Sequence, residues 1–244
     1  MLSIVKSMSL HGLDGYLIDV QVDISAGIPS WQVVGLPDTS VKESSERVRT
    51  SIKNSGYEFQ SKKIVINLAP ADTKKEGSFF DLPIAVGILI NFEEIKRQNL
   101  EHTIFIGELS LNGKINPIKG VLPICIEAKN LGMKRIILPM ENAKEASIVD
   151  GIEVIGVKDL KQVVKFLNGK GKITPQKANL EEFFNSKKQY TFNFSEVKGQ
   201  ENIKRALEVA AARTVIMCYL FGSPGSRKNY DGKTHSINIA RFNI

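Results

Sequence analysis

With 244 residues, of which 42% are hydrophobic, the chain is long enough for one sizeable globular domain and part of a second. No apolar run reaches the length of a membrane span, and residues 1–6 lack the charged start and cleavage site of a signal peptide, so we expect a cytoplasmic protein without a membrane partner. The net charge of +7 lies beyond residue 168, because residues 1–168 carry equal numbers of basic and acidic side chains. The charge is therefore weak evidence that the main domain contacts nucleic acid.

The first third of the chain predicts a hairpin, a strand and a helix. Residues 3–10 and 14–24 alternate between apolar and polar side chains, which is typical of two paired strands, and residues 31–36 predict a third strand. A helix is predicted to begin with Asp38 or Thr39 as its N-cap, to run to about Asn54 and to be closed by Gly56.

Residues 63–90 are the predicted centre of the domain. Residues 64–68 are too continuously apolar for a strand with one solvated face, and residues 79–90 recur at helical spacing, so both are expected deep in one core. The loop at residues 74–77 could present backbone N–H groups and lysines to an anion, but we favour a solvated connection. A solvated face is also favoured over a binding patch for the nearby lysines Lys62, Lys63, Lys74 and Lys75.

The remaining elements of the first domain alternate between strands and helices. Residues 103–118 predict a hairpin turned at Asn112-Gly113. The following segments predict helix, strand, helix, strand and helix in turn: residues 120–130, 135–138, 142–148, 153–155 and 159–167. We therefore predict an α/β (α+β) domain with a mixed sheet over residues 1–168.

Beyond residue 168 the composition changes twice. Residues 169–191 are polar, lysine-rich and interrupted by Pro175, which indicates a basic linker with one short helix at residues 180–184. Residues 192–244 predict the start of a second domain. Its predicted elements are a helix at residues 201–212, a buried strand at 215–221 and a glycine-containing loop.

Five motifs between Met1 and about Ala212 are specific enough to indicate a family. They are Gly35-Leu36-Pro37-Asp38, Asn67-Leu68-Ala69-Pro70-Ala71-Asp72, Phe80-Asp81-Leu82-Pro83-Ile84-Ala85, Gly107-Glu108-Leu109-Ser110-Leu111-Asn112-Gly113 and Val197-Lys198-Gly199-Gln200. With them the chain resembles the bacterial magnesium chelatase-like (YifB/ComM) family. The resemblance implies an N-terminal domain of ribosomal S5 domain 2-like, Lon-protease-like fold and an incomplete start of a P-loop AAA+ ATPase module. It further implies ATP and Mg²⁺ as cofactors and, in ComM-like members, a homo-hexamer that migrates DNA branches. Chelatase activity does not follow from the family name.

The Lon-like comparison predicts no protease. Lon-type proteases carry a nucleophilic serine just after an acidic-Gly pair and a lysine on a later helix. Here Glu76-Gly77 matches that pair, but the nucleophile position falls on Phe79 and the lysine position near Leu122. A serine needs a base within hydrogen-bond reach, so we interpret Ser78 as the N-cap of the helix and expect no catalytic residue.

The candidate cofactor-binding residues form a degenerate phosphate loop: Gly222, Ser223, Pro224, Gly225, Ser226 and Lys228. A phosphate loop follows the pattern G-x-x-x-x-G-K-[ST], in which the second glycine permits a tight backbone turn and the hydroxyl holds Mg²⁺. Arg227 occupies the position of that glycine and Asn229 the position of the hydroxyl. We therefore expect weak nucleotide binding or none.

The residues around this loop indicate frameshifts. Inserting one adenine into a coding sequence for the family's continuation, GKTMMAKRIPSI, yields residues 226–238 as they stand, and residues 216–219 hide the family's HNVL in another frame. We interpret this as a frameshift in the gene or in its sequencing, so that Lys233-Thr234 is not a second phosphate loop. No Walker B acid, sensor or arginine finger is expected after Asn229.

Two hypotheses about function follow. The chain is either a fragment of an ATP-driven DNA motor whose N-terminal domain serves assembly or substrate handling, or an inactive, monomeric remnant with at most a binding role. Neither a metal site nor a disulfide is predicted. The cysteines and histidines lie too far apart for either: Cys125, Cys218, His11, His102 and His235.

Overall fold

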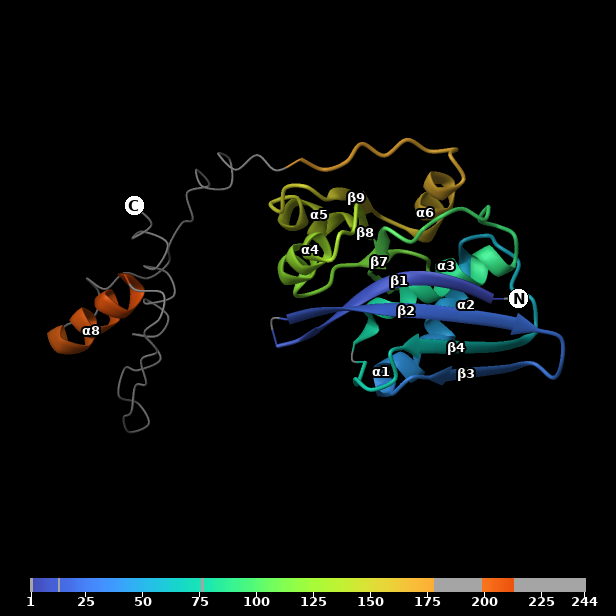
Figure 1. Ribbon diagram of the computed structural model, residues 1–244, viewed down its shortest axis with the longest axis horizontal. Coiled ribbons are helices and arrows are strands. Elements are labelled where there is room, and N and C mark those ends of the chain that lie inside the picture. Colours follow the sequence, from blue (N-terminus) through green and yellow to red (C-terminus); the bar gives the residue numbers. More distant parts are fainter. Residues whose placement is uncertain (1, 13, 76, 178–198, 213–244) are drawn as a thin grey trace. The chain divides into compact units, whose positions relative to one another are not determined.

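The computed structural model describes residues 2–12, 14–75, 77–177 and 199–212 (Figure 1). The chain divides into two units, Met1–Leu180 and Glu181–Ile244. In the second unit the described helix is α8 (Glu201–Ala212), as predicted, with Leu207 and Ala210 buried. Within the described ranges, no helix has the length and apolar character needed to cross a membrane.

A mixed seven-stranded sheet forms the framework of the first unit, in the order β3-β4-β2-β1-β5-β8-β9. Its strands are β1 (Leu2–His11), β2 (Asp14–Ser25), β3 (Ser30–Val34), β4 (Lys63–Ala69), β5 (Thr103–Phe105), β8 (Arg135–Pro139) and β9 (Glu153–Val157). The pairs β1/β2 and β2/β4 are antiparallel, whereas β3/β4, β1/β5, β5/β8 and β8/β9 are parallel. The predicted α/β class with a mixed sheet is confirmed.

Helices cover the two faces of this sheet unequally (Figure 1). They are α1 (Thr39–Lys42), α2 (Ser44–Asn54), η1 (Ser78–Phe80), α3 (Asp81–Asn91), α4 (Val121–Asn130), α5 (Met140–Ala146) and α6 (Leu160–Leu167). Residues of α2, α3 and α6 share one core with β2 and β4, whereas α4 and α5 pack with β8 and part of β1 in a second core. Among the described residues, one face of β3, β4 and the later part of β2 therefore has no covering helix, whereas the start of β2 packs against α4.

Of the strand and helix predicted to lie deep in the core, the helix is confirmed and the strand is not. Every residue from Asp81 to Ile90 of α3 is buried, as the apolar pattern predicts. The prediction that β4 is buried on both faces is wrong, since Ile64, Ile66 and Leu68 are buried and the residues between them are only half-buried. No helix of the described residues covers the outer face of β4, and apolar composition alone cannot reveal which faces are covered.

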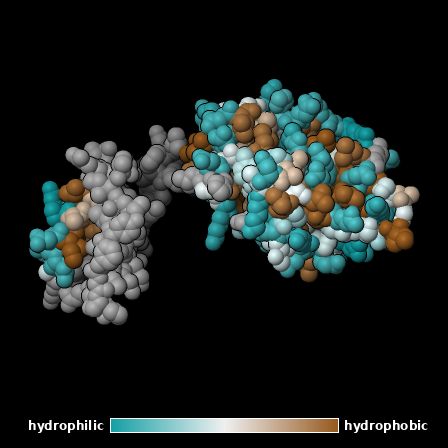
Figure 2. All heavy atoms as spheres, turned by 60° about the horizontal axis from the view of Figure 1, so that its bottom comes forward, coloured by the Kyte–Doolittle hydropathy of each residue, from teal (hydrophilic) through white to brown (hydrophobic). Residues whose placement is uncertain are grey.

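Cross-strand polar pairs occupy that outer face. Lys6 pairs with Asp19 at 2.6 Å between Nζ and Oδ1, and the Asn67 amide donates to Gln21 Oε1 at 3.0 Å. Figure 2 shows hydrophilic and hydrophobic side chains mixed over the visible face of this unit. Such pairs are typical of the solvated side of an antiparallel sheet.

Two predicted elements are each divided in the structure. The hairpin predicted over residues 103–118 is only β6 (Glu108–Leu109) and β7 (Ile115–Asn116), because β5 joins the main sheet and the chain leaves it where Gly107 N–H donates to Phe79 O at 2.9 Å. The helix predicted to run from Asp38 to Asn54 is broken at Glu43 into α1 and α2. Asp38 caps α1, as predicted, by accepting from Val41 N–H at 2.8 Å.

Two docking contacts complete the unit. The hairpin tip lies on the end of α2, where the Asn54 amide donates to Leu111 O at 2.7 Å and Gly113, with φ of 86°, faces Ser55. A Cβ at Gly113 would lie 2.4 Å from Ser55 Oγ, so this approach requires glycine. Two residues assigned to the linker also contact the fold: Ile173 packs against the core, and Gln176 N–H donates to Val154 O at 2.9 Å.

Candidate functional site

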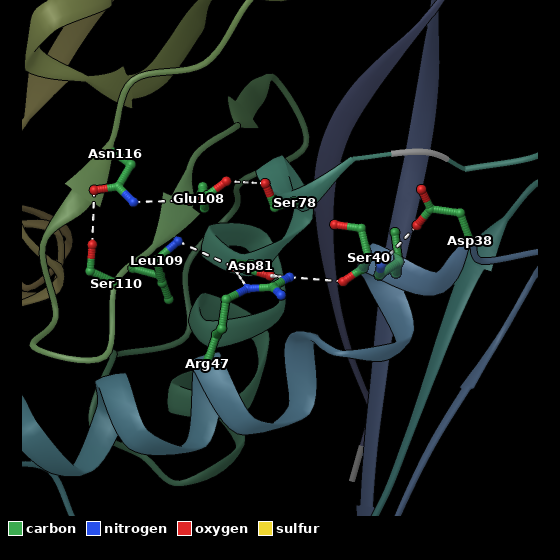
Figure 3. Close-up of polar contacts among 10 residues, drawn as sticks. Asp38, Ser40, Arg47, Ser78, Asp81, Glu108, Leu109, Ser110 and Asn116 are labelled. Carbon is green, nitrogen blue, oxygen red and sulfur yellow. Dashed lines mark hydrogen bonds and ion pairs between the residues drawn. The ribbon is translucent and has the colours of Figure 1, made fainter.

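Polar side chains gather where η1 and α3 meet the β6/β7 hairpin (Figure 3). The Ser78 hydroxyl donates to Glu108 Oε2, and the Asn116 amide donates to Glu108 Oε1 at 2.9 Å. Ser110 Oγ in turn donates to Asn116 Oδ1 at 2.8 Å. Both oxygens of the Glu108 carboxylate therefore accept a hydrogen bond.

These contacts make Glu108 a weak base. Its pKa lies below the ordinary value because of the hydrogen bonds from Ser78 and then Asn116, with the charge of Arg47 adding to them, while burial acts in the opposite direction. A general base needs a pKa near the working pH to remove a hydroxyl proton. The Ser78–Glu108 hydrogen bond joins η1 to the hairpin, and the lowered pKa makes Glu108 a poor general base for Ser78.

A buried ion pair lies beside this network. Arg47 binds both oxygens of Asp81, at 2.7 Å from Nε and 3.0 Å from Nη2, and its Nη2 also donates to Ser40 O at 2.8 Å. Leu109 N–H donates to Asp81 Oδ2 at 3.2 Å. The carboxylate of Asp81 thus joins α2, α3 and the hairpin.

Burial and pairing oppose each other at Asp81. Burial raises the pKa of Asp81 to about 6, and the hydrogen bond and charge of Arg47 offset only part of this rise. The pKa of Arg47 is raised above its ordinary value, first by its hydrogen bond to Asp81. Above pH 6 both the Asp81 carboxylate and the Arg47 guanidinium are charged. Their attraction offsets part of the hydration that each group loses on burial.

The loop before η1 is anchored through its backbone. Lys75 N–H donates to Leu36 O at 3.0 Å, Lys75 O accepts from Asp38 N–H at 2.9 Å, and Gly77 N–H donates to Asp38 Oδ2 at 3.1 Å. The amides of Lys75 and Gly77 are therefore occupied. The anion-binding alternative for this loop lacks these two donors.

The prediction that Lys75 belongs to a solvated lysine face is wrong. Lys75 has 0% exposure, and its ammonium donates to Pro70 O and, at 2.7 Å, to Thr73 O. Burial lowers the pKa of Lys75. The loop folds around this side chain because its carbonyl groups satisfy the ammonium, whereas Lys62, Lys63 and Lys74 are exposed.

The two Lon-type catalytic positions carry apolar side chains. Phe79 is half-buried between the two cores, with its ring 4.5 Å from that of Phe80, and Leu122 lies in the first turn of α4. The predicted N-cap role of Ser78 is wrong. Gly77 precedes η1, Ser78 is its first residue, and the Ser78 hydroxyl reaches Glu108, an ionised acceptor that binds it more strongly than a backbone group.

The predicted nucleotide-binding residues lie outside the described residues. These are Gly222, Ser223, Pro224, Gly225, Ser226 and Lys228, with the departures Arg227 and Asn229; Cys218 and His235 also lie there. Within the described part of the chain, no group of three or more His, Cys, Asp or Glu side chains could hold a metal ion. Cys125 is buried, and burial raises the pKa of its thiol to about 12. Nucleotide binding by Lys228 stays a prediction.

Sequence reasoning missed the roles of Arg47, Glu108 and Asn116. One signal was available, because Asp81 opens an otherwise apolar helix, and a carboxylate at such a position needs a partner. The sequence did not show which cation would meet it. Arg47 lies 34 residues away, and only the packing of α2 against α3 brings the two together.

Comparisons with known proteins agree with this architecture. The family model described as Subunit ChlI of Mg-chelatase matches residues 20–142. The chain is similar to Competence protein ComM of Haemophilus influenzae, with 37% identity over 93% of this chain and 44% of that protein. It is also similar to the uncharacterized protein YifB of Escherichia coli, with 39% identity over 93% of this chain and 44% of that protein.

A third relative is a Lon protease. Lon protease 2 of Bacillus subtilis is 30% identical over 66% of this chain and 32% of its own length. The chain thus spans less than half the length of each of these relatives. The family model covers more than half of this chain, across the sheet and helices that hold Arg47, Asp81, Glu108 and Asn116. The chain therefore belongs to the magnesium chelatase-like family of YifB and ComM, a family of AAA+ ATPases with a Lon-like α/β domain.

Proposed function

We propose that this chain is part of an ATP-driven motor that acts on DNA in the cytoplasm, and that its first unit is a non-catalytic module for assembly or substrate handling. The observation that carries the proposal is the 37% identity to Competence protein ComM over 93% of this chain. Branch migration, a homo-hexamer, ATP and Mg²⁺ come from the family resemblance.

The geometry of the first unit supports a non-catalytic role. Phe79 and Leu122 stand at the two positions where Lon-type proteases carry serine and lysine, and Ser78 donates to Glu108, whose pKa is lowered. A lowered pKa makes this carboxylate a poor general base for the serine proton. The network instead joins η1 to the hairpin, as a structural contact between two elements.

A second candidate is an inactive remnant, and the departures in the phosphate loop favour it for the 244-residue chain. Arg227 places a side chain where the backbone must turn against phosphate, and Asn229 replaces the hydroxyl that would hold Mg²⁺. We propose that this chain does not hydrolyse ATP and binds it weakly, if at all, through Lys228. On this proposal, members of the family hydrolyse ATP and this chain does not.

ATP hydrolysis by the purified chain tests the second candidate. We expect the rate to equal that of Lys228→Ala, and the double change Arg227→Gly with Asn229→Thr to leave it unchanged. Hydrolysis well above the Lys228→Ala rate would show that the divergent loop works as written.

A separate assay tests the motor proposal. A chain with the family's reading frame and downstream sequence restored should migrate a four-way DNA junction when ATP is supplied. Lys228→Ala in that restored chain is the matched control, because it removes the side chain that reaches the β/γ-phosphates. Hydrolysis by the restored chain without junction migration would contradict the DNA role alone.

A further inference from the structure

A cavity lies at the carboxyl ends of two parallel strands. β8 ends at Pro139 and β9 at Val157, and the next residues, Met140 and Lys158, line a space of about 360 Å³. Open α/β sheets bind ligands outside the carboxyl ends of their parallel strands. A cavity of this volume is also of the size that small-molecule sites occupy.

The β7 strand supplies the opposite wall. Ile115 N–H donates to Lys158 O at 3.0 Å, and Leu160 N–H donates to Gly113 O at 2.9 Å. The backbones of Lys114 and Asp159 form an isolated antiparallel β-bridge between the same two segments. These backbone contacts hold the two segments together, so the backbone positions of Lys114 and Lys158 are set before a ligand arrives.

Two lysines on this lining, Lys114 and Lys158, form no ion pair with any described residue. Of the two carboxylates nearby, Asp159 is engaged in capping α6, since its Oδ1 accepts from Gln162 N–H at 2.8 Å. Glu141, exposed in the first turn of α5, is the other. The two lysines and two carboxylates of the lining balance in formal charge, and the Asp159 carboxylate is held at the start of α6 by its capping bond.

Apart from Asn116, the rest of the lining is apolar. Ile115 is 4% exposed, and Pro117 and Met140 stand beside it. We propose that this cavity binds a small anion with an apolar body, whose carboxylate or phosphate head lies between Lys114 and Lys158. Charged groups that fix a head and apolar walls that hold a body are the usual composition of such sites.

The cavity also connects to the polar network. Asn116 lines it and donates to Glu108, which accepts from Ser78. An anion beside Asn116 would therefore lie one hydrogen bond from the residue that holds η1. The Asn116 side-chain amide is a second reporter of binding, independent of the apolar wall.

Methyl NMR of the full 244-residue chain labelled at methionine tests the proposal. Met140 reports on the cavity, and Met8, buried in the core, is the internal reference. The probes are benzoate, phenyl phosphate and uncharged benzyl alcohol, at constant ionic strength. We expect both anions to shift Met140 saturably and not Met8, and the alcohol to shift neither; the tighter anion identifies the preferred head.

Matched lysine variants locate the site. Lys114→Gln and Lys158→Gln should each weaken binding about fivefold, and the double change should abolish it. Lys134→Gln is the control, because Lys134 is exposed and precedes β8 at the opposite end of the sheet. An unshifted Met140 would overturn the proposal. So would unchanged binding in the double variant, equal binding of the alcohol, or equal weakening by Lys134→Gln.

Discussion

Arg47 and Asp81 form a two-pronged ion pair, with Nε 2.7 Å from Oδ2 and Nη2 3.0 Å from Oδ1. The Asp81 side chain is 1% exposed, and that of Arg47 is 23% exposed. Leu109 N–H adds a third hydrogen bond to the carboxylate. The pair joins α2 to α3 at the point where the hairpin crosses them, so three elements depend on one buried charge.

Removing only the cation should destabilise the fold strongly. We expect Arg47→Met to lower the free energy of unfolding at pH 7 by about 3–5 kcal/mol, because it leaves the Asp81 carboxylate buried without its partner. Urea denaturation measures the loss. The control is Lys6→Met in the half-exposed Lys6–Asp19 pair, which should cost at most about 1 kcal/mol. Similar losses in the two variants would contradict this account.

Stability should depend on pH through Asp81. Because burial raises its pKa from 3.8 to about 6, the folded state holds the proton more tightly than the unfolded state does. The contribution of Asp81 to stability is therefore greatest below pH 4 and falls by about 3 kcal/mol as the pH rises to 6. Asp81→Asn should lack this fall in urea titrations at several pH values. A contribution that instead increases with pH would mean that Arg47 outweighs burial.

Lys75 should behave as a structural residue. Lys75→Met keeps the apolar stem but leaves Pro70 O and Thr73 O without their donor, which we expect to cost about 1–3 kcal/mol. Thermal unfolding compares it with Lys62→Met at an exposed lysine, which should change stability by less than about 0.5 kcal/mol. Equal stability of the two variants would show that Lys75 contributes no more to the fold than an exposed lysine.

The first unit should have no peptidase activity. We expect no casein cleavage by the chain, because Phe79 and Leu122 provide neither nucleophile nor base. Ser78→Ala should lower stability by about 1 kcal/mol through the lost bond to Glu108 and change nothing else. Cleavage that disappears in Ser78→Ala would overturn this.

The carboxyl boundary of the first unit can be tested by truncation. A chain ending at Lys177 retains Ile173 on the core and the Gln176 bond to Val154, whereas one ending at Asn168 loses both. Burying one isoleucine contributes about 1.5–3 kcal/mol, so the shorter chain should unfold at a lower urea concentration. Equal midpoints would place the boundary at residue 168, as the sequence predicts.

The sequence by itself determined the elements whose signals are local. Alternation predicted the β1/β2 hairpin, Asp38 predicted the cap of α1, and Asn112-Gly113 predicted the turn between β6 and β7. The uninterrupted apolar run after Asp81 predicted a buried helix. Each of these signals arises between residues a few positions apart, where steric and hydrogen-bond preferences act without the rest of the chain.

Only the tertiary structure decided which distant groups meet. The outer face of β4 is half-buried because no helix in the described part of the chain covers it, and Lys75 is buried because the carbonyls of Pro70 and Thr73 accept from its ammonium. Arg47 became the partner of Asp81 because α2 packs beside α3. Burial and pairing depend on contacts that form only when the layers assemble, and the free energy of a buried charge depends on those contacts more than on its neighbours in sequence.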